Sequence, residues 1–154
     1  MKTLRLCTIL IAMLWALPAL AQIDPELLKA AERGDSEAQF GLALMYAKGQ
    51  GGASQDYFKA FEWLRKAAEQ GHAKAQYAMG NCYDWGYGTT RDYTKAAYWY
   101  QKAAEQGDSD AQNALGLYYF YRIDQQKGCS LVRASAEQGN IVAVENYKKI
   151  GCAK

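Results

Sequence analysis

The side chains best suited to chemistry in this 154-residue chain are one histidine, His72, and four cysteines. Nucleophilic catalysis needs a serine or cysteine beside a histidine base, and a zinc site needs histidines or cysteines at short spacings. Neither pattern is evident, because the cysteines lie far apart and His72 stands in a predicted turn, where we expect it to be solvated. The sequence therefore predicts no catalytic residue, no metal ligand and no cofactor.

Carboxylates are the remaining candidates for acid–base chemistry. The aspartates that lie close together in the sequence are Asp84, Asp92, Asp108 and Asp110. Capping of helix N-termini and ordinary surface charge account for them without a catalytic role. The sequence thus favours a chain that binds another protein over an enzyme.

A six-residue phrase occurs four times and sets the architecture. In its clearest form it reads Ala-Ala-Glu-Gln-Gly-Asp, and the four copies have their glycines at Gly34, Gly71, Gly107 and Gly139, which are 37, 36 and 32 residues apart. A repeat in this range is typical of a solenoid, in which each unit buries its apolar face against its neighbours. The sequence predicts an all-α fold that offers a long surface.

Each period contains two helical patterns. After each turn glycine, small and apolar residues recur on one helical face, beginning with Ala38, Ala75, Ala111 and Ala143. Glycine inside a helix costs up to about 1 kcal/mol, so Gly80 and Gly116 on this face predict close helix crossings. The second helix of each period is expected to begin after an N-cap aspartate, at Asp56, Asp92 and Asp124.

The first 21 residues differ from the repeats. Lys2 and Arg5 precede an apolar run from Leu6 to Leu17, and Ala19-Leu20-Ala21 follows Pro18. This order is typical of a cleaved secretory signal, so we expect residues 22–154 to form the mature protein. The apolar run is about 12 residues, short of the roughly 20 that span a bilayer, although a retained anchor is the alternative. The sequence predicts export across the inner membrane, to the periplasm in a Gram-negative cell.

The charge balance argues against a nucleic acid partner. The whole chain has 18 Lys and Arg and 16 Asp and Glu, and two of the basic residues, Lys2 and Arg5, belong to the signal. The mature chain therefore has 16 of each sign. A net charge near zero gives no reason to expect nucleic acid or an anionic membrane as a partner.

Three cysteines remain after cleavage, and an oxidising compartment would allow them to pair. Cys129 lies ten residues before the turn at Gly139-Asn140, and Cys152 lies twelve residues after it. Two antiparallel helices joined there, each rising about 1.5 Å per residue, would bring the two to a similar height. We expect a Cys129–Cys152 disulfide, with Cys82 as a small buried apolar residue.

The repeated residues resemble the Sel-1-like repeat (SLR) family, an α/α relative of the tetratricopeptide repeats. The matching signature is Gly-x-Gly, then Asp-x-x-Lys-Ala-x-x-Trp, Lys-Ala-Ala-Glu-Gln-Gly and Ala-Gln, most complete from Gly86 through Gln112. The resemblance covers residues 26 to about 150. It implies a right-handed α/α superhelical solenoid of about 3.5 repeats, with units at about 26–48, 56–85, 92–121 and 124–150.

The resemblance also implies a class of function. SLR proteins are scaffolds and adaptors, and exported bacterial members include envelope-associated factors, host-interaction factors and periplasmic immunity proteins that neutralise toxins. A cysteine-rich subgroup with penicillin binding supplies the alternative, a β-lactam- or peptidoglycan-directed enzyme. The middle repeats of this chain lack the cysteine pairs of that subgroup.

A second helical stripe varies between units and is the predicted binding surface. In this architecture the first helices line the concave side, so we expect a protein or peptide partner there and a monomeric protein. Trp85, Tyr87 and Tyr121 flank the loops and are interpreted as aromatic covers of the loops, with exposed contacts to a partner as the alternative. The predicted partner-binding residues are Phe40, Leu44, Lys74, Tyr77, Asn81, Asp84, Asp110, Asn113, Leu117 and Phe120.

Overall fold

The computed structural model describes residues 23–152 and places them in eight α-helices without a strand. The predicted signal peptide, residues 1–21, lies outside the described residues. In the described part, no helix combines the length and the apolarity needed to cross a membrane. The helices are α2 (Pro25–Glu32), α3 (Ser36–Lys48), α4 (Tyr57–Glu69), α5 (Ala73–Trp85), α6 (Tyr93–Glu105), α7 (Ser109–Arg122), α8 (Gln125–Glu137) and α9 (Ile141–Lys149).

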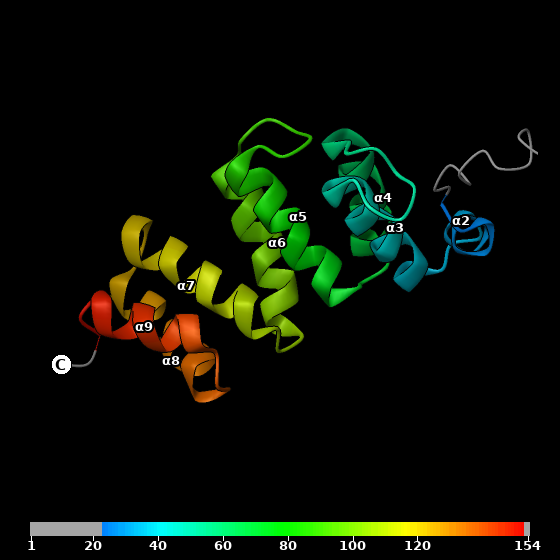
Figure 1. Cartoon of the computed structure of the whole chain (residues 1–154). Coiled ribbons are helices and arrows are strands. Elements are labelled where there is room, and N and C mark those ends of the chain that lie inside the picture. The colour runs from blue at the N-terminus through cyan, green and yellow to red at the C-terminus, as the bar shows by residue number, and fades with distance from the viewer. Residues whose placement is uncertain (1–22, 153–154) are drawn as a thin grey trace, which may run out of the picture.

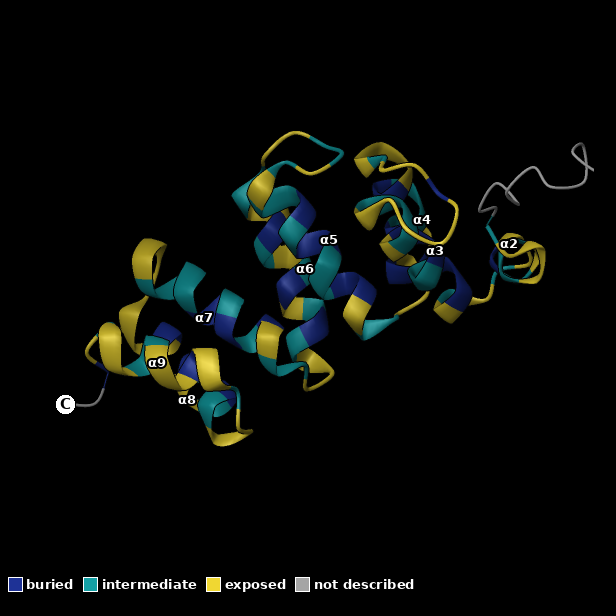
Figure 2. Cartoon of the chain, viewed as in Figure 1, coloured by how far each residue is buried: buried dark blue, intermediate teal, exposed yellow. Residues whose placement is uncertain are grey.

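The helices follow one another through space as they do along the chain, which is the predicted solenoid (Figure 1). Each helix packs mainly on the one before it and the one after it. The pairs α3–α4, α5–α6 and α7–α8 form the most extensive contacts. Exposed residues prevail on α2 and α9 at the two ends, whereas most of the buried residues lie on the helices from α3 to α8 (Figure 2).

Capping residues fix where the helices begin. The aspartates before α4, α6 and α8 accept hydrogen bonds from first-turn backbone N–H groups, as the sequence predicts. Before α3, α5, α7 and α9 the same bond is made at 2.8–3.1 Å by Asp35, His72, Asp108 and Asn140. The four turn glycines have φ between 88° and 99°, a left-handed conformation that ends the preceding helix.

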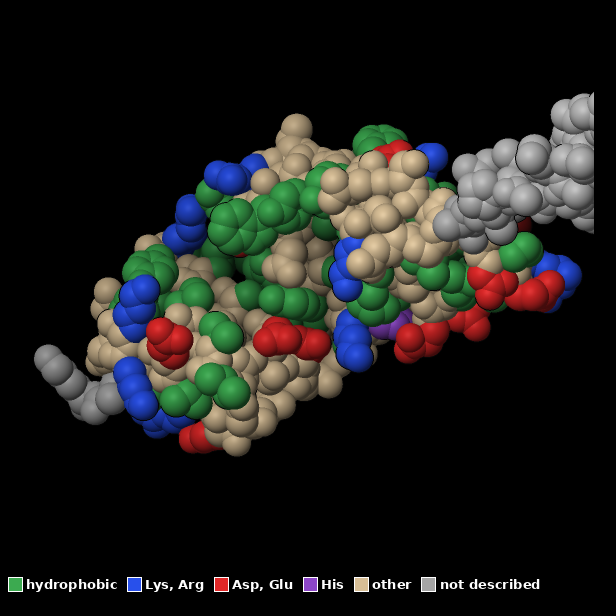
Figure 3. All heavy atoms as spheres, viewed as in Figure 1, with side chains coloured by type: hydrophobic (Ala, Val, Ile, Leu, Met, Phe, Trp, Pro, Cys, Tyr) green, Lys and Arg blue, Asp and Glu red, His purple; other side chains and the backbone are tan. Residues whose placement is uncertain are grey.

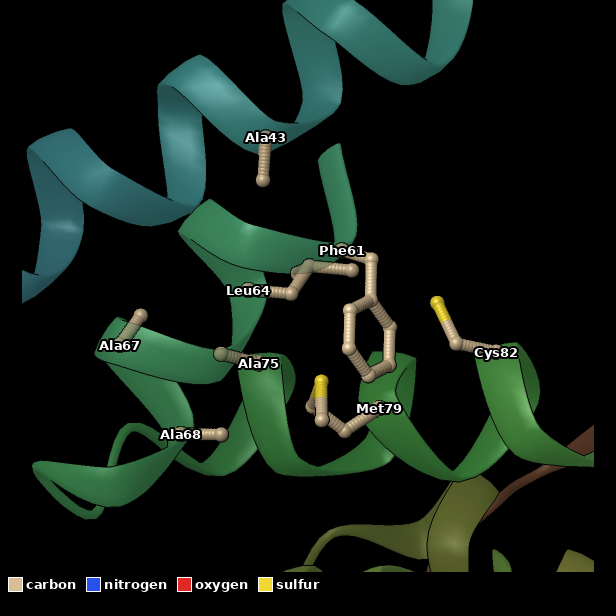
Figure 4. Close-up of a cluster of buried hydrophobic side chains, with 8 residues drawn as sticks. All are labelled: Ala43, Phe61, Leu64, Ala67, Ala68, Ala75, Met79 and Cys82. Atoms are coloured by element: carbon tan, nitrogen blue, oxygen red, sulfur yellow. The ribbon is translucent and has the colours of Figure 1, made fainter. Parts of the chain in front are cut away.

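The largest buried cluster joins α3, α4 and α5. Phe61 and Leu64 of α4 point toward Met79 and Cys82 of α5, and Ala43 of α3 covers them from the other side (Figure 4). Met79 is completely buried, and alanines on all three helices let the backbones approach. Cys82 is buried in this cluster, so it is a core residue, as the sequence predicts. Its burial raises the pKa of the thiol to about 11.

A repeated pair of glutamines joins the two helices of each pair α3–α4, α5–α6 and α7–α8, a feature that the periodicity did not predict. Gln70 donates to Gln39, Gln106 to Gln76 and Gln138 to Gln112, each at 2.7 Å. The side-chain N–H groups of the accepting glutamines donate in turn to backbone carbonyls near the end of the preceding helix. Because the buried Gln39 and Gln76 both donate and accept, their polar groups are satisfied, whereas the donating partners Gln70, Gln106 and Gln138 lie at the surface.

Gly80 and Gly116 mark close helix crossings, as predicted. A Cβ atom on Gly80 would meet the Tyr100 ring of α6. A Cβ atom on Gly116 would lie 2.9 Å from the backbone nitrogen of Val132 and 3.0 Å from the carbonyl oxygen of Gly128, both in α8. At Gly116 only glycine fits, because a backbone obstacle cannot rotate away as a flexible side chain can.

The same substitution at two helical glycines is expected to have opposite effects. Gly116→Ala should lower the free energy of unfolding by about 1–3 kcal/mol, since the added methyl group must push α7 and α8 apart. Gly41→Ala should raise it by up to about 1 kcal/mol, because the nearest atom to its new Cβ is Leu27 Cδ1 at 3.8 Å. Urea denaturation followed by circular dichroism measures both. Equal effects at the two positions would contradict the crossing geometry.

The chain contains the disulfide between Cys129 and Cys152, with the two Cα atoms 5.5 Å apart. It joins α8 to the residues that follow α9. Helix α9 has little other support, because it packs on α8 and only slightly on α7. The disulfide therefore holds the last helix of the solenoid in place.

Candidate protein-binding groove

A groove of about 620 Å³ crosses the molecule between α5, α6, α7 and the start of α9. On this face hydrophobic side chains surround a hollow, and acidic side chains lie near the start of α7 (Figure 3). Its lining combines many aromatic rings with a few polar and charged groups, which is the usual composition of a protein-binding surface. The lining residues are Tyr77, Asn81, Asp84, Trp85, Tyr93, Ala96, Tyr100, Asp110, Asn113, Ala114, Leu117, Tyr118, Tyr121, Arg122, Val142 and Asn146.

Two tyrosines and an asparagine form the centre of the groove. The Tyr100 hydroxyl donates a 2.8 Å hydrogen bond to Oδ1 of Asn81, and the Tyr77 and Tyr100 rings lie 5.8 Å apart. Burial raises the pKa of both hydroxyls, and for Tyr77 a hydrogen bond from Asn81 opposes that shift. Both tyrosines are therefore neutral hydrogen-bonding groups. The Tyr77 ring is partly exposed in the groove, whereas Tyr100 is only 4% exposed.

A charged cluster closes the end of the groove formed by the last turns of α5 and α7. The guanidinium group of Arg122 lies over the Tyr93 ring, 4.1 Å from its centre. Burial raises the pKa of Asp84, whereas the positive charges of Arg91 and Arg122 oppose that shift. Trp85 beside them is 60% exposed, so this end presents a large ring to a partner.

At the other end, asparagines connect α7 to α9. Asn146 donates a 3.1 Å hydrogen bond to Oδ1 of Asn113, which is buried. Asn140 donates a 2.7 Å hydrogen bond to the exposed carboxylate of Asp110. These bonds hold α9 beside α7 and place Val142, which is 58% exposed, at the edge of the groove.

The structure places six of the ten predicted partner-binding residues in this one groove. They are Tyr77, Asn81, Asp84, Asp110, Asn113 and Leu117. The other four lie elsewhere. Phe40 packs against the His72 ring at 4.8 Å, Leu44 and Lys74 are exposed outside the groove, and Phe120 lines a separate hollow beside the disulfide.

The loop aromatics divide between the two roles weighed for them. Tyr87 stacks on Tyr57 of α4 with ring centres 5.1 Å apart, so it covers its loop as predicted. The same prediction is wrong for Trp85 and Tyr121, which line the groove and are 60% and 68% exposed. Trp85 ends α5 and Tyr121 lies in the last turn of α7, both on the groove side.

His72 is not the solvated turn residue that the sequence predicted. Its side chain is only 8% exposed, and Nδ1 accepts a 3.1 Å hydrogen bond from the backbone N–H of Ala75. The ring packs on Phe40, and Nε2 lies 3.1 Å from a Glu37 carboxylate oxygen without a well-aligned hydrogen bond. His72 thus caps α5 in the same way that Asp35, Asp108 and Asn140 cap the helices that follow them.

Replacing His72 separates its cap from its packing. His72→Ala removes the acceptor for the Ala75 N–H group and should lower the free energy of unfolding by about 1–2 kcal/mol. His72→Asn loses the same ring contacts but keeps a cap, as Asn140 does in the last unit, and should be about 1 kcal/mol more stable than His72→Ala. Urea denaturation of the two variants measures the difference. Equal stability would mean that the imidazole does not cap α5.

Comparisons with known proteins agree with this architecture. A family model described as the Sel1 repeat matches residues 36–72, 73–108 and 109–140, so its units begin at α3, α5 and α7. Over 64 residues the chain is 41% identical to the chitin synthase regulator SKT5 of Saccharomyces cerevisiae. This matched segment is 41% of this chain and 9% of the yeast protein.

Two solved structures are also similar. A protective antigen of uropathogenic Escherichia coli that displays an SLR fold is 37% identical, with a TM-score of 0.71 over 74% of this chain and 25% of its own. A Sel1 repeat protein from Oxalobacter formigenes is 37% identical, with a TM-score of 0.73 over 80% of this chain and 51% of its own. The chain spans about half or less of the length of these relatives. Three consecutive matched repeats and the observed helix pairs show that the chain belongs to the Sel1 repeat family.

Proposed function

We propose that this protein is exported and binds a protein partner in the groove between α5, α6, α7 and α9, as an adaptor or inhibitor. The observation that carries the proposal is the groove itself, where exposed aromatic rings lie beside charged and amide side chains. Trp and Tyr in such positions supply much of the binding energy at protein interfaces. Sel1 repeat proteins are protein-interaction adaptors, which supports the same class of function.

Export rests on the predicted signal at residues 1–21 and is supported by the disulfide. Structural disulfides persist in oxidising compartments such as the periplasm and are rare in the cytosol. The yeast relative is by its name a regulator of an enzyme, which supports binding rather than chemistry. In its sharpest form the proposal is an immunity protein that neutralises a periplasm-acting toxin.

Affinity purification from the native envelope tests this proposal. The full-length chain, with a C-terminal tag, is expressed in its own cells, crosslinked mildly and purified from separated periplasmic and cytosolic fractions. We expect the mature chain in the periplasmic fraction, beginning at Gln22 by N-terminal sequencing, with one stoichiometric protein companion. A toxin as companion would support immunity, and a resident enzyme would support regulation.

Three results would count against the proposal. Recovery of the uncleaved chain in the cytosol would overturn export. A folded and abundant protein without any companion, in cells that also produce the candidate toxins, would overturn the adaptor and inhibitor roles. Turnover or covalent labelling with a penicillin by the purified protein alone would favour an enzyme.

A further inference from the structure

We propose that the groove recognises a basic side chain of the partner, lysine or arginine, bound over the Tyr77 ring between Asp84 and Asp110. This inference rests on the proposed function and specifies the chemistry of the partner. It depends on the charges that line the groove, on the tyrosines within the field of those charges, and on the apolar surface around them.

The groove has two carboxylates without a strong internal partner. Among the described residues, neither Asp84 nor Asp110 has a lysine or arginine nitrogen within 4.0 Å, whereas Asp56 and Asp92 do. Asp110 is held by the neutral amide of Asn140. A cation from a partner would therefore find both carboxylates available for a charge-assisted hydrogen bond.

The basic groups near the groove lie at one end of it. Arg122 is the one basic side chain among the described lining residues, and its guanidinium group stacks on Tyr93. Arg91 approaches the same ring from outside, with Nη1 donating to the Tyr93 hydroxyl at 3.4 Å. Their charges lower the pKa of Asp84 against the effect of its burial, whereas Asp110 at the other end of the groove has the neutral amide of Asn140 as its partner.

Each tyrosine of the pair lies within the field of one of the two carboxylates, and all four residues line the groove. Burial is the largest cause that raises the pKa of the Tyr77 and Tyr100 hydroxyls. The charge of Asp110 also raises the pKa of Tyr77, and the charge of Asp84 also raises the pKa of Tyr100. The two rings are 5.8 Å apart. The Tyr77 ring is partly exposed, so a cation can lie over its face, with Asp110 toward one end of the groove and Asp84 toward the other.

The surroundings suit the long apolar stem of lysine or arginine. Leu117, Tyr118 and Trp85 offer apolar surface along the groove. Basic side chains commonly lay their methylene groups on such surface while the charged end reaches a polar group. An acidic side chain in the same place would meet two carboxylates, which gives the groove a preference for positive over negative partners.

A small cationic probe tests this preference without knowledge of the partner. The probe is N-acetyl-arginine N-methylamide, titrated into ¹⁵N-labelled mature protein and followed by two-dimensional NMR. The citrulline counterpart has nearly the same shape and no charge, and N-acetyl-glutamate N-methylamide has the opposite charge. We expect the arginine probe to bind with a dissociation constant of a few millimolar, on the order expected for a fragment of this size. The amides of Tyr77, Asn81 and Asp110 should shift.

Matched variants assign the effect to the groove. Asp84→Asn/Asp110→Asn should weaken binding of the arginine probe by at least about tenfold, since both charge contacts are lost. Glu26→Gln/Glu32→Gln makes the same change in net charge on exposed α2 and should leave binding unchanged. Amide spectra of both variants report whether the fold is retained.

Several results would overturn the inference. They are equal binding of the citrulline probe, preferred binding of the glutamate probe, shifts confined to other parts of the chain, and the absence of shifts at the solubility limit of the arginine probe. A partner that binds in the groove while the arginine probe does not would overturn the basic subsite and leave the proposed function standing. If the arginine probe bound in the groove but no protein companion were found, the basic subsite would stand and the proposed function would be overturned.

Discussion

The variant Tyr77→Ala/Asp84→Lys is expected to bind the protein partner at least about 100-fold more weakly than the wild-type chain. Tyr77 supplies ring surface at the centre of the groove, and truncation of such a residue at an interface commonly costs 2 kcal/mol or more. The lysine adds a positive charge beside Arg122, where the proposed partner carries its own positive charge. Isothermal titration calorimetry with the purified partner measures the loss.

A matched pair outside the groove controls for general damage. Tyr98→Ala/Glu105→Lys removes a tyrosine that is 56% exposed and reverses an exposed charge, both on α6, and neither residue lines the groove. We expect this variant to bind as the wild type does, and both variants to keep their helicity by circular dichroism. If the groove variant kept its affinity for the partner, the site would be misplaced.

Removal of the disulfide should be the most destabilising change away from the groove. The bridge closes a loop with a sequence separation of 23 residues, and the loss of such a crosslink is expected to lower the free energy of unfolding by about 3 kcal/mol. The variant Cys129→Ser/Cys152→Ser avoids a leftover thiol. Urea denaturation measures the change, and wild-type protein treated with a reductant should move by a similar amount.

The destabilisation should begin at α9. This helix packs on α8 and little else, so without the bridge its backbone amides should exchange faster than those of α5 and α6. Because α9 also contributes Val142 and Asn146 to the groove, partner affinity should fall as well. Unchanged amide exchange in α9 of the serine variant would show that helix packing alone holds the end of the solenoid.

The sequence predicted the fold well because the same physical constraint recurs in every unit. In each unit a left-handed glycine ends one helix, a cap begins the next, and a small residue allows the two helices to pack closely. Because these features recur, the pattern in one unit predicts the structure of the others. His72 departs from this pattern in residue type while keeping the function, which is why its burial was missed. The glutamine pairs were not predicted, because they join residues 26 to 31 positions apart and helical periodicity does not show such contacts.

The groove was predicted only in part, because the stripe was taken from the first helix of each unit alone. Tyr100 and Tyr93 come from α6, a second helix. Tyr100 occupies the position of Leu64 in the preceding unit, counted from the cap aspartate, and it is as buried as a core residue, at 4% exposure. Its hydroxyl and ring nevertheless reach the groove, because Gly80 lacks the side chain that would block it.

Site-specific photocrosslinking tests the central claim, that a protein partner occupies this groove. Benzoylphenylalanine is placed at Tyr121 in the groove or at Phe58 on α4, residues that are 68% and 67% exposed, in the full-length chain expressed in its own cells. We predict one discrete crosslinked species from position 121 and none from position 58. A crosslink from position 58 alone, or the same products from both positions, would contradict the account.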